Sequence, residues 1–549
     1  MREVGVPAWV YDLKTAAFLK KIERESEDLW LDYLWLRCRV DVALFCSICL
    51  PDRLEEPFSA LHWHFLERAK PSWRDRSETR RLADAAPRGA AKSTIESYAQ
   101  ILHDVVYGIE AFVGIISTTY PLAEGLVSDL YQTLRTPELH QDLHELYGPI
   151  RIEGSQTDFV AYVEGQDAQG TRIGAFSFGG SVRGEKHAGV RFTKILIDDG
   201  EHPERVRSPE QRRKTWAFLS QDILKAGRRG SVFRVIGTVL HPDSMLNRLL
   251  DDPGWQATRW KSVLSWPRRM PLWERCRRLW SDLSDPDREQ TAQGFYKRHR
   301  AKMDEGAEVL WPEHESLYEL MLLRWAEGEA AFSYEKQNEP VDPTLQVFEP
   351  TRFERCRLLK TEVETNTGRK IHLSDLELSC WLDPRASREI TRGDYAAIAL
   401  VGRDEHGYFY VLKVSMVRDS AERQIARLWE MYDLVGSRCR YAYEDNGFQS
   451  LLEIPLEQAR QERKQAGRAA AMAIEGYTST VNKMNRIMSL APRISNGWIQ
   501  FADDLPPELM DQFRSIPTGS HDDGPDAVER AIWVLDGGHQ AIVEMGGTW

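Results

Sequence analysis

The stretch Arg191-Phe-Thr-Lys-Ile-Leu-Ile-Asp-Asp-Gly-Glu201 joins a short aliphatic run directly to two acids, with a third acid at its end. The run at residues 195–197 predicts a strand buried on both faces, which presents carboxylates at its C-terminal edge. In open parallel α/β sheets, ligands bind at that edge. A core strand followed by an ordinary acidic turn would have the same pattern, so the meaning of this stretch depends on a partner elsewhere in the chain.

That partner is the upstream segment Ala86-Pro-Arg-Gly-Ala-Ala-Lys-Ser-Thr94. Residues 79–86 before it predict a strand, and the apolar spacing of residues 93–106 predicts a helix. A strand, a tight loop and a helix N-terminus are what a phosphate-binding loop requires, because loop and helix N–H groups then face the anion. In such a loop Lys92 neutralises β- and γ-phosphate charge, and the Ser93 hydroxyl holds Mg²⁺.

The loop departs from the standard glycine pattern. Alanines stand at positions 86 and 91, where glycine is usual, and Gly89 is the glycine that remains inside. Alanine is costly where a positive φ is needed, so we expect the backbone to follow a somewhat different path. Taken alone, this loop is a weak signal.

Two further apolar strands strengthen the case. Phe112-Val-Gly-Ile-Ile-Ser-Thr-Thr119 and Ser231-Val-Phe-Arg-Val-Ile-Gly-Thr238 are separated from the acidic strand by helical segments. This alternation predicts a doubly wound α/β sheet. A strand that ends in Gly-Thr after the acidic strand is where many ATPases sense the γ-phosphate.

Four sequence motifs therefore occur in order along the chain: Lys92-Ser93, Asp198-Asp199-x-Glu201, Gly237-Thr238 and Tyr334-Glu-Lys-Gln-Asn-Glu-Pro340. This series resembles the large terminase subunit of tailed bacteriophages, the motor that packages DNA into procapsids. The segment Ser181-Val-Arg-Gly184, with Arg191 after it, is also similar to that family. The resemblance covers about residues 55–535, and the order of the motifs is its specific part.

The resemblance implies a role for each residue in ATP hydrolysis. Asp198 would bind Mg²⁺ through water, and Thr238 would couple hydrolysis to motion. Either Asp199 or Glu201 would position the attacking water, and we favour Glu201 because Asp199 should point back across the strand. Arg88 and Arg183 are candidates for the cation that stabilises γ-phosphate charge. The expected ATP contacts are Arg88, Gly89, Ala91, Lys92, Ser93, Thr94, Asp198 and Thr238.

The pattern restarts in the second half. Residues 378–383, 395–401 and 407–414 predict three antiparallel strands, residues 421–434 a helix, and residues 440–445 a strand that ends in carboxylates. This is the opening order of an RNase H-like sheet. The domains expected are an N-terminal helical region (1–54), a P-loop-type ATPase domain (55–345), a linker (346–370) and an RNase H-like nuclease domain (371–549). The Trp-rich segment 255–325 should close the ATPase domain.

Acids at separate elements of this half predict a metal-dependent nuclease. Such an enzyme needs about three acids, which hold two hard cations about 4 Å apart around the scissile phosphate. Asp383 and Glu444 end strands, and Asp522, Asp523 or Asp526 begins a helix; we take Asp523 as the catalytic one. Each acid alone is most often a turn residue, and their topological order favours the site.

The resemblance extends to the family's packaging nuclease. The segment Asn482-Lys-Met-Asn-Arg-Ile487 resembles an element that would place Lys483 and Arg486 on the DNA backbone, although a surface ion pair is an alternative. Asp394 occupies a place where many relatives carry an extra acid.

Composition limits the remaining alternatives. At 549 residues the chain is too long for a single core, and no apolar run reaches the roughly 18 residues of a membrane span. The N-terminus has no signal-peptide pattern, and seven scattered cysteines predict a reducing cytoplasm. Zinc at Cys46, Cys49, His62 and His64 is disfavoured by the spacing. The net charge of −12 argues against a non-specific DNA coat.

We therefore expect a two-domain enzyme that hydrolyses ATP to move double-stranded DNA and cuts concatemers with Mg²⁺ or Mn²⁺. The resemblance implies a homo-oligomeric ring at the portal protein of a procapsid in the host cytoplasm, with a small terminase subunit that selects the DNA. One alternative is a helicase or repair ATPase fused to a nuclease. Another is a structural protein whose acidic strand ends are only turns.

Overall fold

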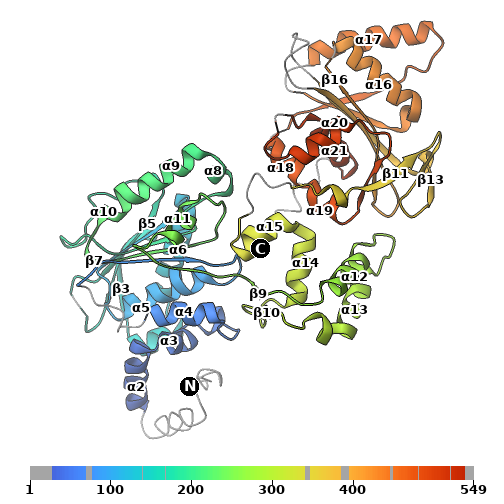
Figure 1. The fold of residues 1–549 in the computed structure, drawn as a ribbon. Coiled ribbons are helices and arrows are strands. Elements are labelled where there is room, and N and C mark those ends of the chain that lie inside the picture. Colours follow the sequence, from blue (N-terminus) through green and yellow to red (C-terminus); the bar gives the residue numbers. More distant parts are fainter. Residues whose placement is uncertain are drawn as a thin grey trace. The chain divides into compact units, whose positions relative to one another are not determined.

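The structure, a computed structural model, describes residues 27–69, 77–138, 140–166, 168–340, 347–384, 395–418, 420–445, 449–479, 481–519 and 521–537. The chain divides into two compact units (Figure 1). The first comprises residues 1–268, 304–321 and 330–342, and the second comprises residues 269–303, 322–329 and 343–549.

The first unit is built on an eight-stranded sheet of order β3-β4-β5-β2-β6-β7-β1-β8. The strands from β5 to β8 in this order run parallel, and β3 and β4 add an antiparallel edge. The predicted doubly wound sheet is therefore confirmed. Its strands are β1 (Arg80–Ala85), β2 (Phe112–Ser117), β3 (Ile150–Ser155), β4 (Asp158–Val163), β5 (Thr171–Ser177), β6 (Phe192–Asp198), β7 (Gly227–Gly237) and β8 (Gln256–Arg259).

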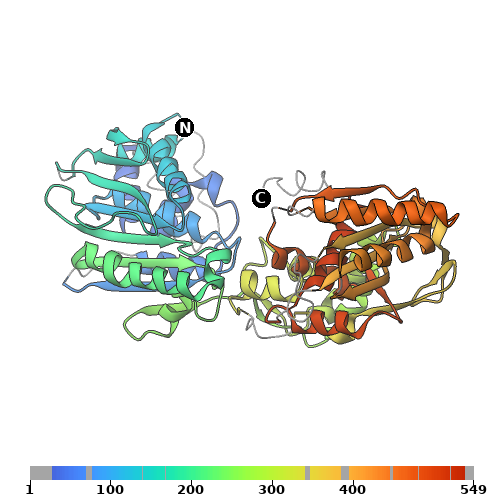
Figure 2. The ribbon, with the colours of Figure 1, turned by 90° about the horizontal axis from the view of Figure 1, so that it is seen from above.

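Helices cover both faces of this sheet, blue on one side and green on the other in Figure 2. The acidic strand β6 shows why: Ile195 and Ile197 pack into one apolar cluster and Leu196 into the other. One layer contains α2 (Glu27–Val40), α3 (Val42–Cys49), α4 (Ala60–Ala69), α5 (Gln100–Val106), α6 (Tyr120–Arg135) and α7 (Gln141–Tyr147); the other contains α9 (Pro209–Phe218), α10 (Leu224–Ala226) and α11 (Met245–Asp251). The described part of the expected N-terminal helical region thus belongs to the core of the first unit.

The second unit has a nine-stranded sheet of order β13-β12-β11-β19-β16-β15-β14-β17-β18. Strands β16, β15 and β14 are antiparallel neighbours, whereas β17 and β18 run parallel to β14. This is the predicted RNase H-like order. The strands are β11 (Glu354–Leu358), β12 (Glu362–Glu364), β13 (Lys370–His372), β14 (Glu377–Asp383), β15 (Ala396–Arg403), β16 (Phe409–Val417), β17 (Arg440–Glu444), β18 (Ile474–Tyr477) and β19 (Ile499–Ala502).

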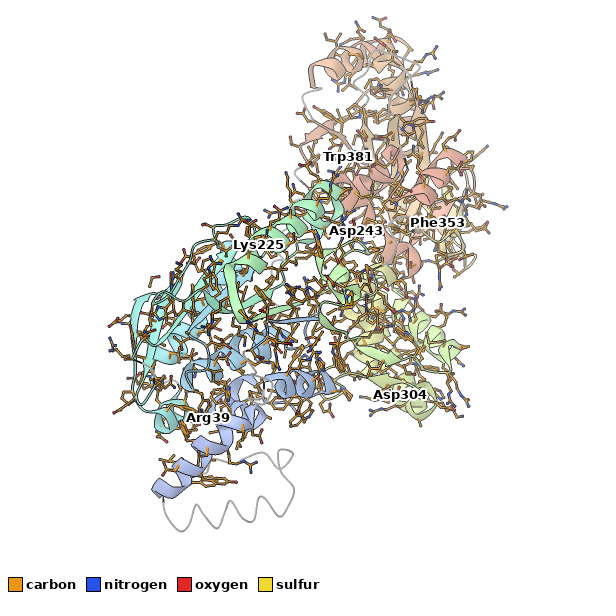
Figure 3. The ribbon with its side chains drawn as sticks, turned by 60° about the vertical axis from the view of Figure 1, so that its left-hand side comes forward. Arg39, Lys225, Asp243, Asp304, Phe353 and Trp381 are labelled. Atoms are coloured by element: carbon orange, nitrogen blue, oxygen red, sulfur yellow. The ribbon has the colours of Figure 1, made fainter. Side chains whose placement is uncertain are left out.

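Alternating side chains of this sheet fill two cores. Trp381, labelled in Figure 3, packs on one face with α21 (Asp523–Leu535), and its neighbour Leu382 packs on the other with α16 (Ala421–Val435). The remaining helices of the unit are α12 (Met270–Ser281), α13 (Arg288–Met303), α17 (Gln449–Gln465), α18 (Lys483–Met488), α19 (Leu490–Ser495) and α20 (Pro507–Ser515). Other elements are α8 (Pro203–Arg207), β9 (Val263–Ser265), β10 (Glu308–Val309), α14 (Leu317–Glu327) and α15 (Glu329–Gln337).

Two boundaries differ from the sequence-based expectation. The expected linker at 346–370 contains β11 and β12, and β11 pairs in parallel with β19. These strands are too short to show an apolar period, so their composition resembles a connector. Helices α12 and α13, which we expected in the ATPase domain, belong to the second unit. There the Arg277 guanidinium donates to the Asn496 side chain over 3.1 Å, and the ring centroids of Trp280 and Trp498 lie 5.6 Å apart.

Within the described residues, the structure contains no helix with both the length and the apolar character that crossing a bilayer demands.

Candidate active sites

The loop after β1 forms the first site. The Ala86 amide donates to the Gly237 carbonyl over 2.9 Å, which fastens the start of the loop to the end of β7. Gly89 has φ +82°, and Ala91 has φ +49°. The expected detour around the alanine is therefore wrong: Ala91 itself takes the left-handed conformation, at a cost of about 1–2 kcal/mol.

Lys92 meets the acidic strand at the end of this loop. Its Nζ lies 3.4 Å from the Asp199 carboxylate, and its side chain is only 8% exposed. Asp199 has φ +45°, so the strand alternation ends at this residue. The expectation that Asp199 points away is therefore wrong, because the left-handed backbone turns its carboxylate toward the loop.

Asp198, the preceding residue, is a buried acid beside the same loop. Its Oδ2 accepts a 2.5 Å hydrogen bond from Ser97, and its Oδ1 has no hydrogen-bond partner among the residues that the structure describes. Burial and the Asp199 charge raise the pKa of Asp198 to about 6, although Lys92 and the hydroxyls of Ser97 and Ser93 oppose the rise. A buried carboxylate oxygen without a partner, next to the Ser93 hydroxyl, fits a hard cation such as Mg²⁺.

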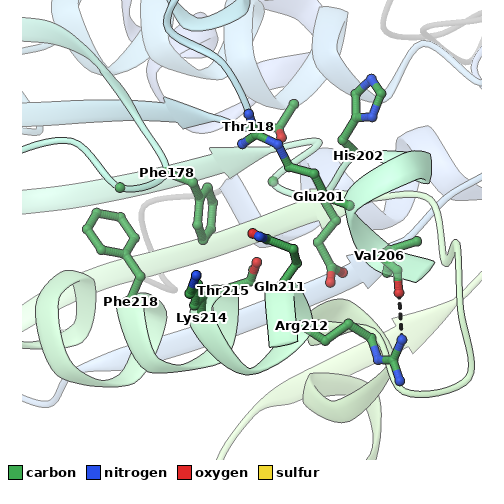
Figure 4. Close-up of a pocket in the computed structure, with 13 residues that line it drawn as sticks. Thr118, Phe178, Glu201, His202, Val206, Gln211, Arg212, Lys214, Thr215 and Phe218 are labelled. Atoms are coloured by element: carbon green, nitrogen blue, oxygen red, sulfur yellow. Dashed lines mark hydrogen bonds between the residues drawn. The ribbon is translucent and has the colours of Figure 1, made fainter. Parts of the chain in front are cut away.

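Glu201, which we favoured for positioning the attacking water, contacts the start of a helix. Its two carboxylate oxygens accept hydrogen bonds from the amides of Met245 (2.8 Å) and Leu246 (3.1 Å), at the start of α11. Burial raises the pKa of Glu201, against the effect of these two bonds. Glu201 therefore caps α11 in this state, and it borders a pocket of about 240 Å³ that Arg205 and Gln211 also line (Figure 4).

The other residues expected to bind the nucleotide differ in their distance from the loop. The Thr238 hydroxyl donates to the Ala86 carbonyl over 3.4 Å, so the predicted sensor strand contacts the loop directly. Both arginine candidates are engaged elsewhere: Arg88 pairs with Glu335 at 2.9 Å and Arg183 with Asp222 at 2.5 Å. The structure thus brings neither guanidinium to Lys92. Gly89 and Thr94 lie in the loop and in the first helical turn after it.

The segment at 334–340, which we call the clamp, forms hydrogen bonds both to the loop at 86–94 and to the residue that follows Thr238. The Arg88 amide donates to the Glu335 carbonyl over 2.9 Å, and Lys336 donates to the Arg88 carbonyl over 3.0 Å. Asn338 is fully buried, and its Oδ1 accepts from the Val239 amide over 2.8 Å, one residue after Thr238. This motif therefore holds the loop at 86–94 and the end of β7 together.

A buried ionic network beneath the loop was missed by sequence reasoning. Arg234 on β7 donates to Glu96 over 2.8 Å and lies 2.8 Å from Asp84 on β1. Although burial opposes it, Arg234, with His64, Arg68 and Thr258, lowers the pKa of Asp84 to about 2. The available signal was a charged residue within the apolar stretch of each strand, Asp84 in residues 82–85 and Arg234 in residues 232–236.

Replacing Arg234 with methionine should destabilise the protein by about 3–5 kcal/mol, because it removes the arginine that pairs with the buried Glu96 and leaves Asp84 with Arg68 as its remaining arginine partner. Urea denaturation measures the loss. Arg228→Met is the matched control, since Arg228 is exposed on the same strand and should change stability by less than about 0.5 kcal/mol. Equal effects of the two substitutions would show that the network does not support the sheet.

The four residues that suggested a zinc site, Cys46, Cys49, His62 and His64, lie in the first unit. His62 lies with Nε2 3.0 Å from the Ala90 carbonyl, so it supports the phosphate loop. His64 lies 3.3 Å from Asp84. Cys46 and Cys49 are buried in the apolar core, and burial raises the pKa of both thiols. These contacts favour structural roles for all four residues.

The second site lies at the ends of β14 and β17. These parallel strands are neighbours with Leu382 opposite Tyr443, so their next residues, Asp383 and Glu444, meet at one edge. Asp526 lies in the first turn of α21, which is fastened to β14 by a 2.6 Å hydrogen bond from Ser379 to the Ala531 carbonyl. Oxygen atoms of Asp383, Glu444 and Asp526 all lie within 4.8 Å of one another.

The electrostatics of this group fit a divalent cation. Burial raises the pKa of Asp383 to about 8; Lys483 opposes the rise, and Asp526, Glu444 and Asp523 add to it. Burial likewise raises the pKa of Asp526 to about 6. Carboxylates that repel one another in a poorly solvated position are stabilised in their charged form by a hard cation.

The other acids of the 522–526 tract are placed differently. Asp523, which we took as catalytic, accepts from the Tyr395 amide and from Lys483, both over 2.9 Å. Asp522 pairs with the same lysine at 2.9 Å. The geometry therefore selects Asp526, and not Asp523, as the third member of the carboxylate triad. Asp394 lies outside the described residues.

Lys483 and Arg486 are directed into this acidic site. Arg486 forms two hydrogen bonds to Asp526, of 3.1 and 2.8 Å, and its side chain is only 5% exposed. The guanidinium expected to contact the DNA backbone is thus occupied by a buried carboxylate. The ion-pair alternative is the correct one for Arg486, although the pair is buried.

Known proteins resemble this chain in structure rather than in sequence. No protein-family model matches the chain, and no curated protein matches it. Several solved large terminases are similar to it. The large terminase of a thermophilic bacteriophage is 11% identical, with a TM-score of 0.43, over 84% of this chain and 91% of that one.

Two more structures extend the comparison. The bacteriophage HK97 large terminase is 12% identical, with a TM-score of 0.31, over 91% of this chain and 99% of that one. The human cytomegalovirus terminase nuclease domain, in a manganese-soaked and inhibitor-bound crystal, is 18% identical, with a TM-score of 0.26, over 34% of this chain and 92% of that domain. Because these scores are below 0.5, the fold and the sites rest on the strand order and the side-chain contacts described above.

Proposed function

We propose that this chain is the large subunit of a viral DNA-packaging motor, which hydrolyses ATP to move double-stranded DNA into a procapsid and cuts concatemeric DNA. The observation that carries the proposal is the presence, in one chain, of a Lys92–Asp199 pair at the edge of the doubly wound sheet and a carboxylate triad on an RNase H-like sheet. The order of the sequence motifs supports the same class of protein.

In the ATPase site, Lys92 and the loop amides would hold the β- and γ-phosphates, while Ser93 and Asp198 would hold Mg²⁺. The ion supplies charge neutralisation for phosphoryl transfer when it is bound. Asp199 is the acid nearest to Lys92, and we assign to it the positioning of the attacking water. Thr238 and the clamp at Asn338 would transmit the state of the loop to the rest of the first unit.

In the nuclease site, Asp383, Glu444 and Asp526 would bind Mg²⁺ or Mn²⁺, which supplies activation of water and of the scissile phosphate. Arg486 orients Asp526 through its two hydrogen bonds. The partners of this function are double-stranded DNA, a portal protein, a small terminase subunit and further copies of the chain in a ring. A net charge of −12 fits a motor that grips DNA transiently.

The purified full chain tests this function directly. It should hydrolyse ATP faster when linear duplex DNA is present, and it should cut that duplex only with Mg²⁺ or Mn²⁺. Unwinding of a forked duplex would favour the helicase alternative instead. Absence of both ATP hydrolysis and cutting would favour the structural-protein alternative.

The two acids after β6 can be distinguished by substitution. Asp199→Asn should lower kcat for ATP by about 100-fold or more, since a positioned acid or base contributes about 10²–10⁴-fold. Glu201→Gln should act mainly on stability, by about 1 kcal/mol, because it weakens the cap of α11. Steady-state ATPase assays and thermal melting measure the two effects. The reverse ranking in kcat would restore Glu201 to the role that we favoured from sequence.

A further inference from the structure

Arg418 places a guanidinium group at the rim of the nuclease site. It follows β16 directly, and its guanidinium carbon lies 4.2 Å from the centroid of the Tyr395 ring. One of its terminal nitrogens is 3.4 Å from Nε2 of His521, the residue before Asp522. Neither contact is with a carboxylate, and the described part of the chain offers this guanidinium no salt bridge.

The register of the sheet places Arg418 on the side of the carboxylate triad. Asp383 on β14 is opposite Ala397 on β15, and Ala397 is opposite Met416 on β16. Opposite residues of antiparallel strands point to the same face, and so does the residue two positions further along. Arg418 stands two positions after Met416, which places it on the face that holds Asp383. Two strand spacings, about 10 Å, separate β14 from β16.

Tyr395 connects Arg418 to the acids at the start of α21. Its amide donates to Asp523 over 2.9 Å, and its ring centroid is 5.5 Å from that of His521. The guanidinium therefore lies beside the acidic tract, between an aromatic ring and an imidazole. Stacking on a ring orients this planar group in advance. Its Nε is buried, so the terminal nitrogens are the donors that another molecule can reach.

A DNA strand that approaches the triad requires a cation of this kind. Lys483 and Arg486, the cations expected to contact the backbone, are paired with carboxylates of the site. Arg418 carries a positive charge that these carboxylates do not take up, and it stands at the edge of the acidic cluster. A guanidinium can bind a phosphate through two parallel N–H donors, which gives it both affinity and a fixed geometry.

We infer that Arg418 binds a backbone phosphate of the DNA strand next to the scissile bond. The distance of about 10 Å between β14 and β16 corresponds to about three nucleotide steps, at ~3.4 Å of helix axis for each. The inference rests on the proposed nuclease function and adds a DNA-binding residue to it. A phosphate contact carries no base information, so Arg418 should strengthen the binding of any duplex equally.

Salt-dependent cleavage kinetics of the full chain test this inference. Initial rates are measured on linear duplexes at saturating Mn²⁺ over a series of NaCl concentrations. Arg418→Met should raise KM for DNA about ten-fold and leave kcat within about three-fold, because one charge-assisted contact is lost while the triad is unchanged. The slope of log(kcat/KM) against log[NaCl] should become shallower by about one, as for one lost phosphate contact. Two duplexes of unrelated sequence should respond equally.

Two further variants sharpen the reading. Arg355→Met is the matched control, because Arg355 is an exposed arginine on β11 of the same sheet and should leave KM and the salt slope unchanged. Arg418→Lys keeps the charge and loses the paired donors, so it should retain the salt slope and raise KM about three-fold. Thermal melting checks that each variant is folded.

The outcomes separate this inference from the nuclease function itself. A KM and a salt slope in Arg418→Met equal to those in Arg355→Met would overturn the inference and leave the nuclease standing. A fall in kcat at unchanged KM would also overturn it, since the residue would then act elsewhere than in DNA binding. If Arg418→Met does not fold, Arg418→Lys decides, and an unchanged KM there overturns the inference. A parent chain that does not cut DNA would contradict both.

Discussion

Replacing Lys92 with alanine is expected to reduce ATP hydrolysis to background while metal-dependent DNA cutting continues at the rate of the unchanged protein. Lys92 is the buried cation at the end of the phosphate loop, 3.4 Å from Asp199 and in the electrostatic environment of Asp198. Removing one preorganised donor from a developing oxyanion typically costs about 10²–10³ in kcat. The loss here should be at least that large, because a full charge is removed as well.

Steady-state release of phosphate measures the ATPase rate, and cleavage of a linear duplex with Mn²⁺ measures the nuclease in the same preparation. Lys225→Ala is the control, since Lys225 is an exposed lysine of the first unit. Retention of ATPase activity in Lys92→Ala would remove the loop from the nucleotide site. Loss of both activities together would indicate that the substitution had unfolded the chain.

Replacing Asp383 with asparagine should give the reciprocal result, with cutting lost and ATP hydrolysis retained. Asp383 ends β14 and shares the proposed cation with Glu444 and Asp526. Loss of a residue that only hydrogen-bonds to a metal ligand already costs about 10–100-fold, so loss of the ligand itself should cost more than about 100-fold. The isosteric amide keeps the shape of the side chain and removes the charge that the metal requires.

Time courses of duplex cleavage at saturating Mn²⁺ provide the measurement. Asp504→Asn, on the exposed turn after β19, is the matched control and should cut normally. If Asp383→Asn cut DNA at the unchanged rate, the triad would be an ordinary cluster of strand-end acids.

Much of the fold was accessible from sequence because buried strands leave a clear pattern. The runs that end at Asp198 and Asp383 were identified as strands from their aliphatic residues, and both are strands in the structure. Short edge strands are different. Those at residues 354–358 and 362–364 show no period, since only Cys356 and Val363 of them are buried. The pairing of the first of them, β11, with β19 depends on residues more than a hundred positions away.

The sites were predictable in their residue types and less so in their geometry. The structure brings Lys92 close to Asp199, and it brings together the strand-end acids Asp383 and Glu444 with Asp526. The orientation of Asp199 depends on one left-handed residue, which no periodicity reveals. Likewise, Lys483 and Arg486 carry the charge expected of a DNA contact, and only the packing of α18 against α21 shows that they face Asp523 and Asp526.

The most direct test is anomalous diffraction from crystals of the full chain grown with Mn²⁺ and a non-hydrolysable ATP analogue. Two separate manganese sites are predicted. One should lie beside Ser93 and Asp198, with the triphosphate against Lys92, and the other should lie among Asp383, Glu444 and Asp526. Manganese absent from both places, or a nucleotide bound away from Lys92, would contradict the assignment of this chain as a combined ATPase and nuclease.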